Sequence, residues 1–205
     1  MDISHLDTIA AIATPLGKAG IGVIRLSGNE SLAILNRICP KLSEVKPKTV
    51  RLTTVIDPVS KTGIDEACII YYQEPASYTG EDIVEIQCHS NPDILKRILS
   101  VIIQDNARLA EKGEFTKRAF INGKIDLTKA ESVIDLIDSN NTKASEYALN
   151  QLNGSLYKHI NTLRNSLIYC LEHVEASIDF PDEVTALDST TLKAKINENK
   201  IEIEK

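Results

Sequence analysis

The chain has 205 residues, of which 42% are hydrophobic and 25% charged, and its formal net charge is -6. This length can form one large or two small domains with a real core. The acidic balance excludes binding of nucleic acid through a general electrostatic field, so contact with RNA would need a local basic patch or parts outside this sequence. The start of the chain has no basic leader, and no apolar run approaches the ~20 residues that cross a bilayer, which predicts a soluble, cytoplasmic protein without membrane contact.

The four cysteines, Cys39, Cys68, Cys88 and Cys170, form no Cys-x-x-Cys pair. This spacing is typical of buried free thiols in a reducing compartment, and we expect neither a disulfide framework nor a metal site. Cys88 precedes His89, but neighbours on a strand point to opposite faces, so their adjacency is weak support for a nucleophile and its base. The residues alone predict no catalytic group.

The first 112 residues predict mixed strands and helices. Runs rich in β-branched and aromatic residues predict strands over 8–14, 21–27, 48–57, 65–73 and 81–89, with the third and fourth joined as a hairpin. Helices are predicted over 29–39, with Asn29 as N-cap, and over 91–104, with Asn91 as N-cap and Pro92 in the first turn.

The chain from Gly113 onward predicts helices. A short apolar helix ends at Asn122-Gly123, and the helix over 126–139 has Thr128 and Glu131 at the spacing of a capping box. The stretch from about 142 to 177 predicts one long helix with an apolar stripe that packs as ordinary bundle core. The stripe consists of Leu156, Ile160, Leu163, Leu167, Cys170 and Val174.

Residues 178–183 break this helix, and a last one begins near Asp188. It reaches Lys205 without a stop signal, so we expect the chain to be a piece of a longer protein. The elements together predict an α+β fold. A mixed-sheet domain over 1–120 is followed by an all-α segment over 121–205.

The glycine-bearing stretch TPLGKAGIGVIRLSG (14–28) is no phosphate loop. Gly17-Lys18 is followed by alanine, and Ile12 stands where the first glycine of a P-loop belongs. A dinucleotide fingerprint fails as well, because Arg25 occupies the third glycine position and a strand follows instead of a helix. The stretch is better explained as a glycine turn that leads into a strand.

Three charged residues stand out as candidate ligand contacts. Arg25 shares a strand face with apolar residues and needs a partner, which could be a structural carboxylate or an anionic ligand. Glu85 lies in a strand expected to be mostly buried. It could pair with Arg25 or accept hydrogen bonds from the N–H groups of a fused aminopyrimidine ring. Lys124, at the junction of the two halves, could be a solvated charge or meet a carboxylate-bearing ligand.

Four stretches together resemble the tRNA-modification GTPase family called MnmE or TrmE. They occur in the family's order between Asp7 and about Glu183, and they are DTIAAIATPLGKAGIGVIRLSG, SYTGEDIVEIQCH, GEFTKRAFINGKIDLTKAESVIDLID and EASIDFPDE. The resemblance implies an N-terminal folate-binding domain similar to aminomethyltransferases, which forms a homodimer. It also implies a helical domain into which a Ras-like GTPase domain is inserted.

The resemblance also implies a reaction and a partner. With a flavin- and NADH-dependent partner protein, the family adds an aminomethyl or carboxymethylaminomethyl group to C5 of the wobble uridine of tRNA. The one-carbon unit comes from a tetrahydrofolate derivative, either 5-formyl- or 5,10-methylene-tetrahydrofolate. The GTPase domain would use GTP, Mg²⁺ and K⁺. Because its phosphate loop is missing here, we expect no GTP hydrolysis by this chain alone.

By motif match, the family's folate contacts fall on Arg25, Glu85 and Lys124. Glu85 would hold the amino and ring N–H groups of the pterin, and the two cations would supply positive charge, which could meet a carboxylate. Two alternatives stay open. The chain could be a non-enzymatic dimerisation scaffold with a vestigial pocket. It could also be a stand-alone folate-dependent aminomethyltransferase, which the uncapped last helix and the long helical stripe disfavour.

The chain departs from the family pattern in two places. The family usually has Gly-Arg-Gly-Gly at 17–20 and His-Gly-Gly at 89–91, where this chain has Gly-Lys-Ala-Gly and His-Ser-Asn. Glycine permits left-handed backbone angles that alanine and serine resist. We therefore expect the loop after the Glu85 strand to differ and assign no role to His89.

Overall fold

A computed structural model of the chain describes residues 7–42, 44–180 and 189–204. The chain divides into two compact units, Met1–Ile125 and Asp126–Lys205. The predicted domain boundary at 120/121 lies close to this division. The predicted helix start at Asp188 and most of the predicted break over 178–183 lie outside the described residues.

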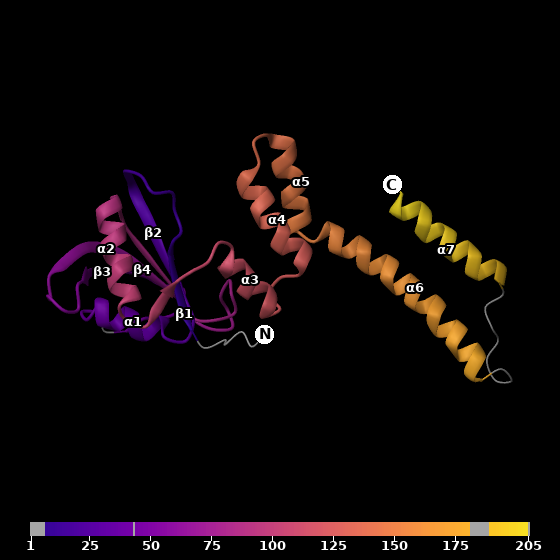
Figure 1. The fold of residues 1–205 in the computed structure, drawn as a ribbon, viewed down its shortest axis with the longest axis horizontal. Coiled ribbons are helices and arrows are strands. Elements are labelled where there is room, and N and C mark those ends of the chain that lie inside the picture. The colour runs from indigo at the N-terminus through magenta and orange to yellow at the C-terminus, as the bar shows by residue number, and fades with distance from the viewer. Residues whose placement is uncertain (1–6, 43, 181–188, 205) are drawn as a thin grey trace. The chain divides into compact units, whose positions relative to one another are not determined.

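The first unit is built on a six-stranded sheet with the order β3-β4-β5-β2-β1-β6 (Figure 1). Neighbouring strands are antiparallel, except that β1 and β6 are parallel. The sixth strand was not predicted, because three residues are too few to show alternation. The strands are β1 (Thr8–Ile12), β2 (Ala19–Ser27), β3 (Val50–Ile56), β4 (Gly63–Tyr72), β5 (Ile83–Ser90) and β6 (Ala107–Leu109).

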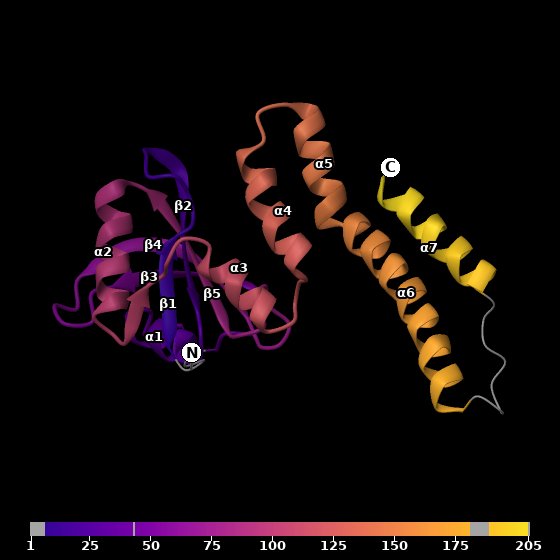
Figure 2. The same cartoon turned by 45° about the vertical axis from the view of Figure 1, so that its right-hand side comes forward.

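Two helices, α1 (Ser31–Ile38) and α2 (Pro92–Ile103), cover one face of the sheet, and α3 (Glu114–Ile121) lies on the other side (Figure 2). The apolar residues of α1 and α2 recur at helical spacing, so each helix buries one stripe against the strands. The predicted cap of α2 is confirmed, since the Asn91 side chain accepts a hydrogen bond from the backbone N–H of Asp93 (2.9 Å). The predicted cap of α1 is wrong. That helix follows Glu30, which makes no side-chain cap bond.

The pairing of β2 with β5 decides which side chains face the helices. Arg25 lies directly opposite Glu85, and Ile24 opposite Ile86. Because side chains alternate along a strand, Ile24 and Ile86 enter the core under α1 and α2, while the two charged residues share the other face. Parts of that second face are open, since Ile21 on β2 and Leu52 on β3 are about two-thirds exposed. The charged pair therefore does not lie on the face that α1 and α2 bury.

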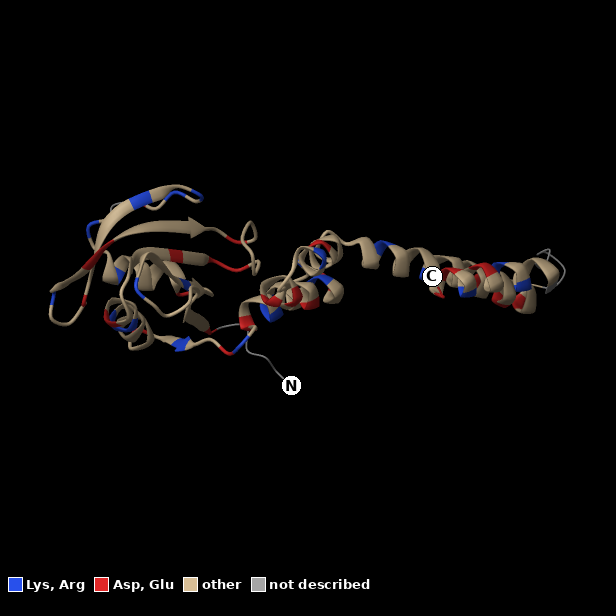
Figure 3. Cartoon of the chain, turned by 90° about the horizontal axis from the view of Figure 1, so that it is seen from above, with Lys and Arg blue, Asp and Glu red and all other residues tan. Residues whose placement is uncertain are grey.

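The second unit contains four helices in its described part. These are α4 (Leu127–Asp138), α5 (Thr142–Leu152), α6 (Ser155–Asp179) and α7 (Ser189–Ile203). Helix α4 packs against α5 and α6 against α7, and the Asn199 side chain donates a hydrogen bond to the Ser166 hydroxyl (3.0 Å). Positively and negatively charged residues are interspersed along these helices (Figure 3). No helix in the described residues combines the length and apolar character needed to span a membrane.

The prediction of a single helix over 142–177 is wrong. The helix breaks at Asn153-Gly154, where Gly154 adopts φ +84°, a left-handed angle that favours glycine. The predicted apolar stripe is also largely uncovered within the described residues, since Leu156, Ile160 and Leu167 are more than two-fifths exposed. Cys170 is buried. The stripe is therefore not the closed bundle core that its spacing suggested.

The start of α4 differs from the predicted capping box. Asp126 is the N-cap, and its carboxylate accepts a hydrogen bond from the backbone N–H of Lys129 (3.0 Å). The Thr128 hydroxyl donates to the same carboxylate oxygen (2.6 Å) instead of capping the helix.

We expect Asp126→Ala to lower the free energy of unfolding by about 1 kcal/mol, because it leaves first-turn N–H groups of α4 without a partner. Glu131→Ala, at the predicted capping-box position, should change it by less than about 0.5 kcal/mol, as at ordinary surface sites. Urea denaturation followed by circular dichroism measures both variants. A larger loss in Glu131→Ala would restore the capping-box assignment.

Candidate functional site

Arg25 and Glu85 form a direct ion pair across β2 and β5. Arg25 donates to Glu85 Oε1 from both Nε (3.0 Å) and Nη2 (2.6 Å). The Glu85 side chain is 14% exposed and that of Arg25 is 30% exposed. The structure thus shows an internal partner for Arg25, one of the two possibilities that the sequence left open. The pair remains reachable from solvent.

Two aromatic rings lie close to the Arg25 guanidinium. Its Cζ atom is 5.7 Å from the centroid of Phe115 on α3 and 5.9 Å from that of Tyr78, in the loop before β5. The Tyr78 hydroxyl is hydrogen-bonded to the Thr116 hydroxyl (2.9 Å), which ties this loop to α3. Guanidinium groups are attracted to ring faces at this range. Sequence reasoning missed both rings, because each lies far along the chain from Arg25.

Lys124 follows α3 and contacts the loop before β5 that carries Tyr78. Its Nζ donates to the backbone carbonyl of Pro75 (2.8 Å), and its side chain packs beside Gly80. Within the described residues, no hydrogen bond or ion pair joins Lys124 to Arg25 or Glu85. The structure therefore brings two of the three predicted contacts together, while the third, Lys124, bonds to the loop that carries Tyr78.

A buried ionic network holds α3 in place. Arg118 is one-tenth exposed and donates to Glu81 (3.1 Å), Glu114 (3.2 Å) and the Asp7 carboxylate (2.7 Å). Arg108 on β6 donates to Glu114 from two nitrogens (2.8 and 2.5 Å). These hydrogen bonds, opposed by burial, lower the pKa of Glu114 to about 2. The network fixes the helix that presents Phe115 to Arg25.

His89 has a partner that the sequence did not indicate. Its Nδ1 lies 2.8 Å from Asp65 Oδ1, and its backbone N–H donates to Asp65 Oδ2 (2.8 Å). Cys88 points the other way, into the core, where burial followed by the Asp65 charge raises the pKa of its thiol to about 11. Cys88 and His89 are therefore not paired as nucleophile and base. All four cysteines are free thiols, but only Cys39, Cys88 and Cys170 are buried as expected, whereas Cys68 is part-exposed.

The two segments that depart from the family pattern, 17–20 and 89–91, contact each other. Ala19 is the cross-strand partner of Ser90, and the Ser90 hydroxyl donates to the Gly17 carbonyl (2.8 Å). Lys18, Ala19, Ser90 and Asn91 are not among the residues with positive φ. The backbone of this segment therefore needs no glycine at these positions, and Ser90 supplies a hydrogen bond that glycine could not.

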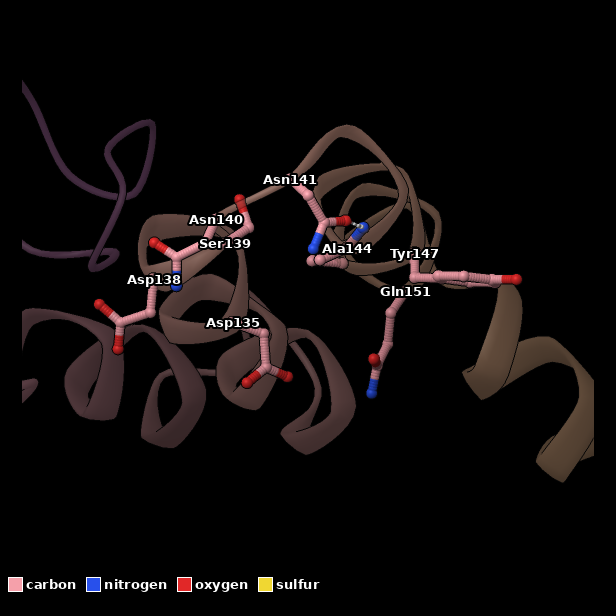
Figure 4. A pocket seen from close by; sticks show the side chains of 9 residues that line it. Asp135, Asp138, Ser139, Asn140, Asn141, Ala144, Tyr147 and Gln151 are labelled. Atoms are coloured by element: carbon pink, nitrogen blue, oxygen red, sulfur yellow. Dashed lines mark hydrogen bonds between the residues drawn. The ribbon is translucent and has the colours of Figure 1, made fainter.

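A separate hollow of about 470 Å³ lies at the turn between α4 and α5 (Figure 4). Asp135, Asn140 and Gln151 are among its lining residues, and the Asn141 side chain caps α5 by accepting from the Ala144 N–H (2.9 Å). No group of three or more His, Cys, Asp or Glu side chains in the described chain is placed to hold a metal ion.

Two family models match the chain and meet near the division between its two units. Residues 8–124 match the model described as GTP-binding protein TrmE N-terminus, and residues 127–205 match the MnmE helical domain. The chain belongs to the MnmE/TrmE family. The resemblance noted in the sequence is thereby confirmed, as is the α+β fold followed by helices.

Similar proteins in the family are named tRNA modification GTPase MnmE. The chain is 44% identical to that of Alkaliphilus metalliredigens over 204 residues, 48% identical to that of Aquifex aeolicus over 177, and 45% identical to that of Clostridioides difficile over 205. These alignments cover 97%, 86% and 97% of this chain but only 44%, 39% and 44% of those proteins. The chain thus spans about two-fifths of the length of its MnmE relatives.

Proposed function

We propose that this chain is the folate-binding part and the beginning of the helical part of a tRNA-modification GTPase. In this proposal Glu85 holds N–H groups of a tetrahydrofolate derivative, with Arg25 and Lys124 supplying positive charge. The observation that carries it is the part-exposed Arg25–Glu85 pair beside two aromatic rings. A carboxylate and a guanidinium that reach solvent next to aromatic surface suit a flat ligand rich in hydrogen-bonding groups.

The whole protein's chemistry follows as a further part of the proposal. The folate, as its 5-formyl or 5,10-methylene form, would supply a one-carbon unit for a (carboxymethyl)aminomethyl group on C5 of wobble uridine in tRNA. A homodimer and a flavin- and NADH-dependent partner protein would take part in the cytoplasm. GTP, Mg²⁺ and K⁺ would bind in a GTPase domain. This sequence contains no Gly-x-x-x-x-Gly-Lys-Ser/Thr motif, so the chain alone is expected not to hydrolyse GTP.

Titration calorimetry with 5-formyltetrahydrofolate tests the proposal. We expect saturable binding that Glu85→Ala weakens at least about a hundredfold, because the charged hydrogen-bond acceptor for the ligand is lost. Glu66→Ala, which removes an exposed carboxylate on the neighbouring strand β4, should bind like the unmodified chain. Sedimentation velocity shows whether the chain forms a dimer in solution. Absence of folate binding in a chain that does dimerise would favour the scaffold alternative instead.

A further inference from the structure

The turn that leads into β3 carries a cluster of positive charge on a chain that is acidic overall. Lys46, Lys48 and Arg51 lie within six residues, whereas the whole chain has a formal net charge of -6. All three residues are exposed. In the described part of the chain, none of their side chains forms an ion pair or a hydrogen bond with another residue. The fold therefore does not use these three charges.

The backbone of this turn is fixed to the sheet. The Lys48 N–H donates to the Tyr71 carbonyl on β4 (2.7 Å), and the Thr49 hydroxyl donates to the Lys46 carbonyl (2.7 Å). Lys46 and Arg51 line the same hollow of about 210 Å³ at the start of β3. Because the backbone is already ordered, a ligand that binds these cations does not have to order the turn first.

Protection of the sheet edge explains only part of the cluster. Positive charge on an edge strand hinders edge-to-edge pairing between sheets, and β3 lies at one edge of this sheet. This explanation suits Arg51, which lies within β3 (Val50–Ile56). It does not account for Lys46 and Lys48, because both precede the strand. We therefore consider a ligand for the cluster as a whole.

We propose that Lys46, Lys48 and Arg51 form a contact for RNA phosphate groups and help to position a tRNA substrate on this chain. Lysine and arginine bind phosphate oxygens through charge and hydrogen bonds. The segment from 41 to 51 contains no aromatic residue, so it offers no ring for base stacking, and the contact is to the backbone whatever the base sequence. This inference rests on the proposed tRNA-modifying function. It supplies the local basic patch that RNA contact with an acidic chain requires.

Binding of an unmodified tRNA transcript to the 205-residue chain tests the inference. Three phosphate contacts predict that the dissociation constant, measured by fluorescence anisotropy, rises about 20- to 40-fold between about 50 and 200 mM salt. Replacement of Lys46, Lys48 and Arg51 by glutamine should weaken binding at the lower salt at least about tenfold and flatten the salt dependence.

A matched triple variant controls for the change in net charge. It replaces three exposed lysines outside the cluster by glutamine, so its formal net charge equals that of the first variant. These lysines are Lys96, Lys112 and Lys158. The control should bind tRNA within about threefold of the unmodified chain and keep its salt dependence, because its phosphate contacts are intact.

A single substitution at Lys48 separates binding from stability. Lys48 has φ +60°, a left-handed angle that glycine adopts without steric cost. Lys48→Gly should weaken tRNA binding about threefold to tenfold, while the midpoint of urea unfolding stays unchanged or rises. Lys61→Gly, at φ +58° in the turn after β3, removes one charge at the same type of position and should leave tRNA binding unchanged.

The outcomes separate this inference from the folate proposal. Absence of tRNA binding at the lower salt, or equal weakening in the two triple variants, overturns the phosphate contact and leaves folate binding intact. Tighter association with vesicles of phosphatidylcholine and phosphatidylserine than with tRNA also overturns it. Loss of folate binding with an intact tRNA contact would overturn the folate part alone. If circular dichroism shows that the cluster variant does not fold, equal binding by Lys48→Gly and Lys61→Gly overturns the inference instead.

Discussion

Replacing Arg118 with methionine should lower the free energy of unfolding by about 3–5 kcal/mol, the cost of removing one partner from a buried ion pair. Arg118 donates to Glu81, Glu114 and Asp7, and the side chains of Glu81 and Glu114 are both about one-tenth exposed. Without the guanidinium, Glu81 would remain buried without this cation, and Glu114 would keep only its hydrogen bonds from Arg108. Methionine keeps much of the apolar stem of arginine. The loss of unfolding free energy therefore reflects the missing charge and hydrogen bonds more than the missing side-chain volume.

The control is an exposed arginine with a single carboxylate partner. Arg37 pairs with Asp105 at the surface, where its side chain is 42% exposed. Arg37→Met should lower the free energy of unfolding by no more than about 1 kcal/mol, because exposed ion pairs contribute little. Urea denaturation followed by circular dichroism measures both variants. Similar losses in the two would show that the Arg118 network is not a main support of the first unit.

Acidification should destabilise the first unit through Glu114. The pKa of this carboxyl is lowered from 4.5 to about 2, chiefly by hydrogen bonds from Arg108 and despite opposition from burial. Because the folded-state pKa lies below the unfolded value, the stabilisation is fully present above about pH 5 and is lost as the pH falls toward 2. A shift of this size corresponds to about 3 kcal/mol. Asp7, whose pKa is also lowered, adds to the same trend.

The variant Glu114→Gln separates this contribution from other carboxylates. It should be less stable than the unmodified chain at pH 6 and should lose less further stability between pH 6 and pH 2. Glu131→Gln, which removes an exposed carboxylate on α4, should follow the unmodified chain over the same range. The measurement is the free energy of unfolding in urea at a series of pH values. An equally steep pH dependence in Glu114→Gln would assign the acid loss to other groups.

Alternation along the strands is enough to predict that Arg25 and Glu85 each lie on the strand face opposite to their isoleucine neighbours Ile24 and Ile86. It does not predict which face the helices cover, because that depends on where α1 and α2 pack. Ile24 and Ile86 go under these helices, and the charged pair therefore takes the open side. The ion pair itself depends on β2 and β5 being neighbours, although 60 residues separate Arg25 from Glu85. Local patterns carry no information on such pairing.

Other features illustrate the same limit. Arg118 meets Asp7 across 111 residues of sequence, and no local pattern indicates that contact. The break before α6 does have a local signal in Asn153-Gly154, but the regular spacing of apolar residues on either side favours one continuous helix. At the start of α4, Thr128 and Glu131 match the spacing of a capping box, whereas the backbone N–H of Lys129 bonds to Asp126.

The direct opposition of Arg25 and Glu85 on adjacent strands has a consequence for how this chain can change over time. Deletion or insertion of one residue within either strand would send its charged side chain under α1 and α2 and bring an isoleucine or valine to the open side. The same shift would expose core residues and remove the pair. A one-residue change of length within β2 or β5 therefore costs both the core packing and the ion pair, whereas surface loops tolerate changes of length.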